Sequence, residues 1–276
     1  MSTPAGEQHI TSPQNARVKE LVALRKDGVL RRELKRFLLE GRRGVAAALD
    51  APHVTVHEVI YCEHLLGPEK SLPDKARDKG VPLVRVSKDV FKKIADVMTP
   101  QGIAAVVAIP EWDLDRMLAA RDALLVAACG IQDPGNLGTL IRSCEAAGAA
   151  GLLLLEGTAE PFNPKVVRST AAGLLNLPMV RLTGAAFLDE AHRRGLRLVA
   201  TAARGGRPYL GFDWRTRPLA LCIGSEAQGL PADVEAACKE KVTIPMRGAA
   251  ESLNAAVAAS ILLFAAQEPG QAPLRS

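Results

Sequence analysis

Three segments in the second half of the chain place polar side chains just after apolar runs of strand length. They span 129–149, 218–231 and 241–266, and their candidate functional residues are Asn136, Arg142, Glu226, Ser252 and Asn254. Amide, guanidinium, carboxylate and hydroxyl groups at strand ends can orient a polar ligand and stabilise charge that develops on it. Together the segments predict one binding site for a polar ligand.

The first segment reads as a buried strand over 123–129, a turn at 134–136 and a helix over 137–147. Asn136 lies at the entrance of that helix, and Arg142 follows about one and a half turns later. Taken alone, Asn136 is an ordinary helix cap and Arg142 is a solvated charge on a helix. This segment alone therefore does not indicate a binding site.

The other two segments have the same order of elements. Strands are expected at 219–224 and 242–245, and Ser252 is expected to cap the helix that follows the second strand. Small residues between strand and helix let the backbone approach a ligand closely, and in the second segment these are Gly224, Ser225 and Gly229. Each of these strand-to-helix connections (corners), taken singly, is more often a plain turn than a binding site.

Taken together, the three segments resemble the three motifs of the SpoU (TrmH) branch of the SPOUT methyltransferases. They read CGIQDPGNLGTLIRSCEAAGA, PLALCIGSEAQGLP and KVTIPMRGAAESLNAAVAASILLFAA. That family transfers a methyl group from S-adenosylmethionine to a ribose 2′-hydroxyl of tRNA or rRNA. The resemblance is strongest from Ala123 to Ala266 and implies the same activity here.

The resemblance also implies roles for single residues. The matching catalytic set is Asn136, Arg142, Glu226, Ser252 and Asn254. The positions expected to bind S-adenosylmethionine are Gly224, Ser225, Gly229, Ile244, Met246 and Leu253. We interpret Arg142 as a bidentate clamp on an RNA phosphate that also supports the forming alkoxide, because a guanidinium is nearly always charged and is a poor base.

The elements from residue 123 onward predict an α/β domain with an open parallel sheet. Helical patterns separate most of the expected strands, which favours a sheet covered on both faces; the strands are 123–129, 151–155, 178–182, 196–200, 219–224 and 242–245. A Rossmann-type cofactor site is excluded, because Gly130, Gly135 and Gly138 do not have G-x-G-x-x-G spacing. The family resemblance implies instead a C-terminal trefoil knot and a homodimer.

Residues 1–110 predict a separate small α/β domain. Expected strands lie at 37–40, 54–61, 81–86 and 103–109, with helices at 45–50, 73–79 and 88–96 between them. The stretches SPQNARVKELVALR, FLLEGRRGV and TPQGIAAVV resemble the ribosomal-protein-like RNA substrate-binding domain that often precedes SpoU catalytic domains. A linker at 111–121 then leads to the expected methyltransferase domain at 122–276.

The net charge of the chain is concentrated in this first domain. Residues 1–110 hold 18 Lys and Arg against 13 Asp and Glu, whereas residues 111–276 hold 17 of each kind. Beside a methyltransferase domain such a stretch indicates a phosphate-binding surface, and a solvated amphipathic helix pair is the alternative. The candidate RNA contacts are Arg17, Lys19, Arg25, Lys26 and Arg42, together with Lys165 and Arg168 from the family resemblance.

Composition argues against several other classes of protein. The five cysteines form no CxxC pair, so neither a disulfide framework nor a zinc site is indicated. Residues 1–12 lack the apolar core of a signal peptide, and the most apolar helix, 255–266, is shorter than the roughly twenty residues that span a bilayer. We therefore expect a cytoplasmic protein with no metal, membrane or DNA partner.

Two other classes of function stay open beside an RNA methyltransferase. A non-catalytic RNA-binding protein of this fold would be favoured by changes at Asn136, Arg142 or Asn254, and all three are present. A metabolic α/β enzyme with a small acceptor would not need the basic first domain. Among RNA substrates that domain favours rRNA, specifically 23S rRNA, over tRNA, with either a housekeeping role or protection of the ribosome from antibiotics.

Overall fold

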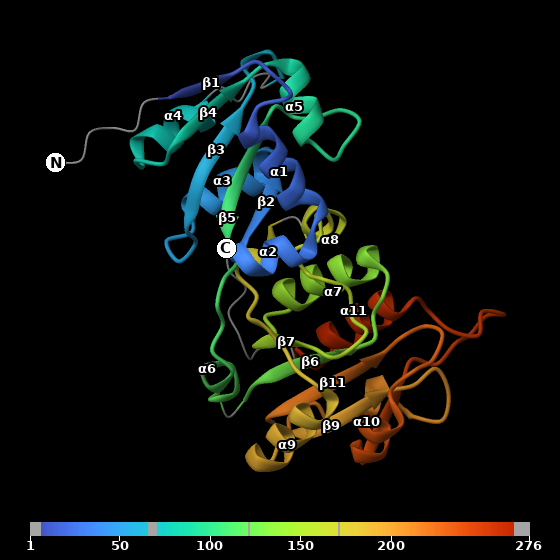
Figure 1. The fold of residues 1–276 in the computed structure, drawn as a ribbon. Coiled ribbons are helices and arrows are strands. Elements are labelled where there is room, and N and C mark those ends of the chain that lie inside the picture. Colours follow the sequence, from blue (N-terminus) through green and yellow to red (C-terminus); the bar gives the residue numbers. More distant parts are fainter. Residues whose placement is uncertain (1–6, 66–70, 121, 171, 268–276) are drawn as a thin grey trace. The chain divides into compact units, whose positions relative to one another are not determined.

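The computed structural model divides the chain into two compact units (Figure 1) and describes residues 7–65, 71–120, 122–170 and 172–267. The N-terminal unit comprises Met1–Glu111 and Glu160–Leu175, and the C-terminal unit comprises Trp112–Ala159 and Asn176–Ser276. The boundary expected after residue 110 lies next to the observed one. Segment 160–175, expected in the second domain, groups with the first, so the chain passes between the units three times.

The N-terminal unit is built on a mixed five-stranded sheet in the order β1-β4-β3-β5-β2. Its strands are β1 (Gln8–Ile10), β2 (Arg36–Glu40), β3 (Val56–Tyr61), β4 (Leu83–Val86) and β5 (Ile103–Ala108). The pairs β1–β4 and β3–β4 are parallel, whereas β5 is antiparallel to both of its neighbours. Strands β2 to β5 were expected from the sequence, but β1 is too short and too polar to show a strand pattern.

Helices cover both faces of this sheet. On one face α1 packs against α5, and Leu38 of β2 belongs to the core that they form. Leu39 points to the opposite face, where it meets Gly44 of α3, because side chains alternate along a strand. The helical elements of residues 16–111 are α1 (Ala16–Lys26), α2 (Gly28–Leu34), α3 (Arg42–Asp50), η1 (Glu63–Leu65), α4 (Ser71–Asp78) and α5 (Lys88–Ile94).

Segment 160–175 is held on the N-terminal unit by a buried arginine and an aromatic contact. Arg31 is only 3% exposed, and its guanidinium donates to the Glu160 carboxylate and to two backbone carbonyls at the end of α1. Phe162 packs on Phe37 with the ring centroids 5.0 Å apart. These contacts explain why the segment leaves the second unit; its helical elements are α8 (Pro164–Ser169) and η2 (Gly173–Leu175).

The C-terminal unit is built on a seven-stranded parallel sheet in the order β10-β12-β9-β11-β6-β7-β8. Its strands are β6 (Leu124–Cys129), β7 (Gly151–Leu154), β8 (Met179–Arg181), β9 (Arg197–Thr201), β10 (Arg207–Pro208), β11 (Leu219–Gly224) and β12 (Glu240–Thr243). The central strands β6 and β11 are apolar and almost wholly buried, as expected of a parallel sheet covered on both faces. The predicted α/β class with a parallel sheet is confirmed.

Figure 1 shows α7 and α11 on one face of this sheet and α9 and α10 on the other. Helices α7 and α11 pack on each other, and the hydroxyl groups of Ser143 on α7 and Ser260 on α11 are hydrogen-bonded at 2.7 Å. No helix in the described ranges is long and apolar enough to cross a membrane. The helical elements are α6 (Leu114–Leu118), α7 (Pro134–Ala146), α9 (Gly184–Arg194), η3 (Tyr209–Gly211), α10 (Ala232–Ala237) and α11 (Ala255–Ala266).

Two helix starts differ from the sequence-based expectation. Helix α7 begins at Pro134 and is capped by Asp133, so the expected turn at 134–136 is the first turn of the helix, where proline is favourable. Helix α11 is capped by Asn254, whose side-chain oxygen accepts two backbone N–H groups, and not by Ser252. The prediction of a serine cap was wrong, because the helix begins one residue after Asn254.

Candidate active site

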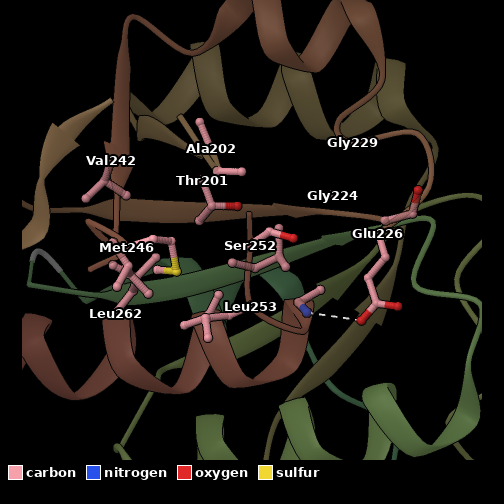
Figure 2. Close-up of a pocket in the computed structure, with 16 residues that line it drawn as sticks. Thr201, Ala202, Gly224, Glu226, Gly229, Val242, Met246, Ser252, Leu253 and Leu262 are labelled. Atoms are coloured by element: carbon pink, nitrogen blue, oxygen red, sulfur yellow. Dashed lines mark hydrogen bonds between the residues drawn. The ribbon is translucent and has the colours of Figure 1, made fainter. Parts of the chain in front are cut away.

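A pocket opens at the carboxyl ends of β9, β11 and β12, beside the start of α11 (Figure 2). Its volume of about 240 Å³ far exceeds the roughly 10–15 Å³ that one water molecule needs, so it has the size of a ligand site. Met246, Leu253 and Leu262 form an apolar side of the pocket, and Glu226 lies at its other end (Figure 2). The pocket thus offers apolar walls and a charged rim to one ligand.

The pocket brings together all six positions expected to bind the cofactor, namely Gly224, Ser225, Gly229, Ile244, Met246 and Leu253. Glu226 and Ser252 of the expected catalytic set also line it. Sequence reasoning missed other lining residues, among them Thr201, Ala202, Ala203, Ala255, Ala258 and Leu262. The first three follow the predicted strand at 196–200, whose end meets the ends of its parallel neighbours at one sheet edge. The shared sheet edge could therefore have pointed to these three residues from the sequence. The alanines of α11 give no such signal, because in the sequence they look like ordinary core residues.

The loop after β11 folds back on itself beside the pocket. The backbones of Ser225 and Gly229 exchange two hydrogen bonds, of 3.1 and 2.9 Å. A Cβ atom on Gly224 would lie 2.3 Å from the carbonyl carbon of Gly229, which is far too close for two non-bonded atoms. The loop's own backbone therefore requires glycine at position 224, whereas the sequence suggested close approach of a ligand as the reason.

Three expected catalytic residues from different segments form one hydrogen-bonded network. The Asn136 side-chain amide donates to Oε1 of Glu226 at 3.1 Å, and the Asn254 amide donates to the same oxygen at 2.7 Å. The Asn254 amide also donates to the side-chain oxygen of Asn136 at 2.9 Å. The backbone N–H of Ala255, at the start of α11, is a third donor to Oε1 of Glu226 at 3.2 Å. A carboxylate at a helix N-terminus is electrostatically favourable, so Glu226 is well placed to join the corners.

The hydrogen-bonding capacity of this network is unevenly used. Both amide hydrogens of Asn254 donate within the network, and its oxygen caps α11 through two backbone N–H groups. Among the described residues, Oε2 of Glu226 has no hydrogen-bond partner. Asn254 therefore orients Asn136 and Glu226, and the free carboxylate oxygen of Glu226 remains available to a ligand.

Arg142 lies on the exposed face of α7, six residues after Asn136. It does not line the pocket, and within the described ranges its guanidinium makes no hydrogen bond or ion pair. A guanidinium without an internal partner keeps its planar set of donors for an external anion such as a phosphate. The structure thus leaves Arg142 accessible and separate from the Glu226 network.

Cys129 ends β6, immediately before the loop that leads to Asn136. Burial raises the pKa of its thiol to about 12, so the group stays protonated at neutral pH and is a poor nucleophile. Covalent catalysis by this thiol is therefore not expected. Among the residues that the structure describes, no group of three or more His, Cys, Asp or Glu side chains could hold a metal ion.

The cations expected to contact RNA all lie in the N-terminal unit, but several of them are engaged there. Arg17 forms ion pairs with Glu20 and Glu58. Arg25 donates two hydrogen bonds to backbone carbonyls at the C-terminal end of α5. Both arginines therefore contribute to the folded unit, and their charge is less available to a phosphate than the sequence suggested.

The remaining candidate cations differ in their surroundings. Lys19 and Lys26 are exposed on α1, and seven residues separate them, so they share one face of the helix. No ion pair engages either lysine within the described part of the chain. On α8, Lys165 is exposed and Arg168 pairs with Asp96, whereas Arg42 is half-buried at the start of α3. The two lysines of α1 are therefore the best candidates for phosphate contacts.

Comparison with known proteins gives matches over both units. Residues 123–264 match the SpoU rRNA Methylase family, and residues 15–105 match the MRM3-like substrate binding domain. The chain is 35% identical over 257 residues to the 23S rRNA (guanosine(2553)-2′-O)-methyltransferase RlmP of Bacillus subtilis, covering 93% of this chain and 98% of that protein. It is 33% identical over 271 residues to the 23S rRNA (uridine(2479)-2′-O)-methyltransferase of Streptomyces viridochromogenes, covering 96% and 93% of the two chains.

The fold is also similar to a solved structure that contains the cofactor. The crystal structure of an AdoMet-bound rRNA methyltransferase from Sinorhizobium meliloti matches with a TM-score of 0.82 and 29% sequence identity, covering 94% of this chain and 97% of that one. The family match spans Asn136, Arg142 and Glu226 as well as the start of α11. With its parallel sheet, its pocket and these similarities, the chain belongs to the SpoU rRNA methylase family.

Proposed function

We propose that this protein transfers the methyl group of S-adenosylmethionine to a ribose 2′-hydroxyl of 23S rRNA. The observation that carries the proposal is the network of Asn136, Glu226 and Asn254, which joins three distant segments at the rim of a ligand-sized pocket. A polar network at strand ends suits the orientation of a ribose beside a bound donor. Two relatives that cover nearly the whole chain are named 23S rRNA 2′-O-methyltransferases, which favours rRNA over tRNA.

The pocket fits S-adenosylmethionine in its chemistry. Ile244, Leu253 and Leu262 supply apolar surface for a flat adenine ring, and the backbone beside Gly224 supplies hydrogen-bonding groups. Glu226 supplies a carboxylate oxygen for a hydroxyl or ammonium donor at the other end of the pocket. When bound, S-adenosylmethionine would supply an electrophilic methyl carbon: the ribose oxygen would bond to that carbon, the carbon–sulfur bond would break with its electron pair on sulfur, and the 2′-hydroxyl proton would pass to a base.

The residues of the chain perform the positioning that such an in-line displacement needs. Glu226 and Asn136 orient the ribose at the pocket rim, and Asn254 holds those two side chains in place. Arg142 lies outside the pocket on α7, and its proposed role is to bind a phosphate of the RNA beside the reacting ribose through two parallel N–H donors. From there its positive charge supports the negative charge that develops on the ribose oxygen. The chain thus contributes orientation and electrostatic stabilisation rather than a covalent intermediate.

We propose that the N-terminal unit supplies RNA affinity through Lys19 and Lys26. Changing both lysines to Gln should weaken RNA binding, because fewer counterions are released when the complex forms. The log–log salt dependence should fall by about 0.7–0.9 for each RNA phosphate that is no longer neutralised. The measurement is RNA affinity over a series of salt concentrations, with S-adenosylmethionine affinity expected to stay unchanged.

A matched control removes the same amount of charge from paired lysines. Lys35 and Lys75 form ion pairs with Glu111 and Asp50, so their charge is already offset. Changing both to Gln should alter RNA affinity and salt dependence less than the α1 pair does. Equal effects of the two double variants would show that net charge, and not the α1 surface, governs binding.

We propose that the protein is a homodimer that associates through α11. Val257 and Phe264 of this helix are 45% and 55% exposed, and both lie on one helix face because seven residues separate them. Leu210 in η3, a turn that packs on α11, is 81% exposed. Several exposed apolar side chains on one helix and on the turn packed against it are typical of a protein interface, and a second copy of the chain is the proposed partner.

Phe264→Asp should convert the dimer to a monomer in analytical ultracentrifugation, because a carboxylate would be buried in an apolar interface. Val29→Asp places the same charge at a 53% exposed valine of α2 and should leave the dimer intact. A wild-type protein that sediments as a monomer, or a Phe264→Asp variant that remains dimeric, would exclude this interface.

Two further features are proposed from the family. The last helix, α11, is proposed to be threaded through a loop so that the C-terminal third forms a trefoil knot, as the family resemblance implies. The cytoplasm is the proposed site of action, because the rRNA substrates of the named relatives are there. DNA is not proposed as a partner, since a ribose 2′-hydroxyl is the acceptor.

The test of the proposed function uses purified protein, isotopically labelled S-adenosylmethionine and RNA from cells that lack the gene. Transfer of the label to 23S rRNA by the wild-type protein, and loss of this transfer in the Asn136→Ala variant, would support the proposal. Transfer to tRNA alone would establish the alternative substrate, and RNA binding without transfer would establish a non-catalytic RNA-binding protein. Antibiotic sensitivity of the same cells would distinguish a protective role from a housekeeping role.

A further inference from the structure

Thr158 is one of the few buried polar residues in the described ranges, and it lies in the turn after β7. It is 6% exposed, and its hydroxyl makes two hydrogen bonds. Oγ1 donates to the carbonyl oxygen of Ala128 in β6 at 2.9 Å and accepts the backbone N–H of Gly130 at 3.1 Å. The hydroxyl therefore binds the backbone on both sides of the last residue of β6.

Gly130 is the residue at which the chain leaves β6 and turns toward α7. Its φ of +69° lies in the left-handed region, so the backbone direction changes there. Gly157 approaches it closely, since a Cβ atom on Gly157 would lie 3.4 Å from the Cα atom of Gly130. The turn that carries Thr158 thus packs directly on the turn that begins the loop to α7.

Two further sets of hydrogen bonds hold the turns together. The N–H of Ala159 donates to the carbonyl oxygen of Ile131 at 2.9 Å. The Arg181 guanidinium donates to the carbonyl oxygens of Thr158 and Ala159, each at 3.2 Å. Residues 157–159 are therefore packed against residues 128–131 and hydrogen-bonded to them.

The supported loop leads to the proposed active site within a few residues. Asp133 caps α7 by accepting the N–H of Asn136, whose side chain then reaches Glu226. Gly130 also faces the pocket loop, since a Cβ atom on it would lie 3.9 Å from the Cβ atom of Ser225. A displacement of Gly130 would therefore move Asn136 relative to the pocket.

We propose that Thr158 is a positioning residue for methyl transfer, which acts by holding the Gly130–Asp133 loop so that Asn136 stays on Glu226. This inference rests on the proposed function. Thr158→Val keeps the shape of the side chain but leaves the N–H of Gly130 without its partner, whereas the Ala128 carbonyl keeps its bond from the N–H of Leu155 at 3.0 Å. Thr158→Ser retains the hydroxyl.

The kinetic test compares single-turnover methylation at saturating RNA and S-adenosylmethionine. Thr158→Val should slow the reaction by at least about tenfold, because a small misplacement of an orienting group costs rate. Its affinity for S-adenosylmethionine should stay within about twofold of wild type, and Thr158→Ser should react within about twofold of wild type. The matched control is Thr170→Val, which removes another buried hydroxyl, one that donates to the Val167 carbonyl in the N-terminal unit; the methylation rate of this variant should be unchanged.

A second measurement does not depend on activity. Amide hydrogen exchange of a peptide that covers residues 128–136 should be faster in Thr158→Val than in wild type and unchanged in Thr170→Val. Unchanged exchange, an unchanged methylation rate in Thr158→Val, a parallel loss of cofactor affinity, or no rescue by serine would each overturn the inference. A wild-type protein that transfers no methyl group would contradict the proposed function, while the exchange result would still decide whether Thr158 holds the loop.

Discussion

Arg142→Lys lowers the single-turnover rate of methyl transfer by on the order of a hundredfold or more, as expected for loss of one transition-state donor. Arg142 is exposed on α7 and has no internal partner in the described part of the chain. Its planar fork is therefore free to bind a phosphate through two donors. Lysine keeps the positive charge but provides only a point charge without that geometry.

The same variant distinguishes two roles for Arg142. In one, Arg142 binds an RNA phosphate as a bidentate clamp; in the other, it removes the proton of the ribose 2′-hydroxyl. A lysine that accepts the proton would retain substantial activity, and its pH–rate profile would shift toward the lysine pKa of about 10.4. Single-turnover rates from about pH 6 to about pH 10 distinguish the two, because a clamp loses rate across the range. Arg116→Lys, at an exposed arginine of α6, is the matched control and should react like wild type. A fast lysine variant with a displaced profile would refute the clamp.

Ala258→Phe abolishes detectable binding of S-adenosylmethionine, or raises its Kd by at least about a hundredfold, which corresponds to about 2.7 kcal/mol. Ala258 lies on α11 and lines the pocket, so a phenyl ring there would fill space that the cofactor needs. Gly224→Val is a poor test of the same site. Its Cβ would collide with the backbone of Gly229 and disturb the loop itself.

Isothermal titration calorimetry of the purified variant measures this effect directly. Ala265→Phe serves as the control, because Ala265 is also partly exposed on α11 but does not line the pocket. Thermal unfolding of both variants shows whether the fold persists. Unchanged cofactor affinity in a folded Ala258→Phe protein would place the cofactor elsewhere.

The sequence predicted the sheet and the corners that form the pocket well. The strands predicted at 219–224 and 242–245 are apolar runs followed by small or polar residues. The structure has β11 at Leu219–Gly224 and β12 at Glu240–Thr243, and the carboxyl ends of both line the pocket beside α11. Parallel strands share one carboxyl edge, so the pattern contains this three-dimensional information. The family resemblance added that Asn136, 88 residues before Gly224 in the chain, belongs to the same site.

Other features depend on contacts that no local pattern contains. Segment 160–175 leaves the second unit because Glu160 meets the buried Arg31, two residues far apart in the sequence. Arg17 and Arg25 look like free cations in the sequence, yet each also bonds a partner from a distant element, Glu58 of β3 and the end of α5 respectively. Asn254, and not Ser252, caps α11, and the amide group of Asn254 is also held by Asn136 and Glu226, which are distant in the sequence. The type of a residue can therefore indicate a binding site in the sequence, but only the fold shows whether its side chain is free to contact a ligand.

The central claim is that the methyl group is placed on a ribose oxygen of RNA, and its chemical position tests that claim most directly. Labelled RNA from the purified protein is hydrolysed in alkali, which cleaves each phosphodiester through the neighbouring 2′-hydroxyl and spares those whose 2′-oxygen is methylated. The network of Asn136, Glu226 and Asn254 predicts that the label is recovered in alkali-stable dinucleotides, and that Asn136→Ala yields none. Recovery of the label in mononucleotides, as from a methylated base, or no transfer by the wild-type protein, would contradict the account.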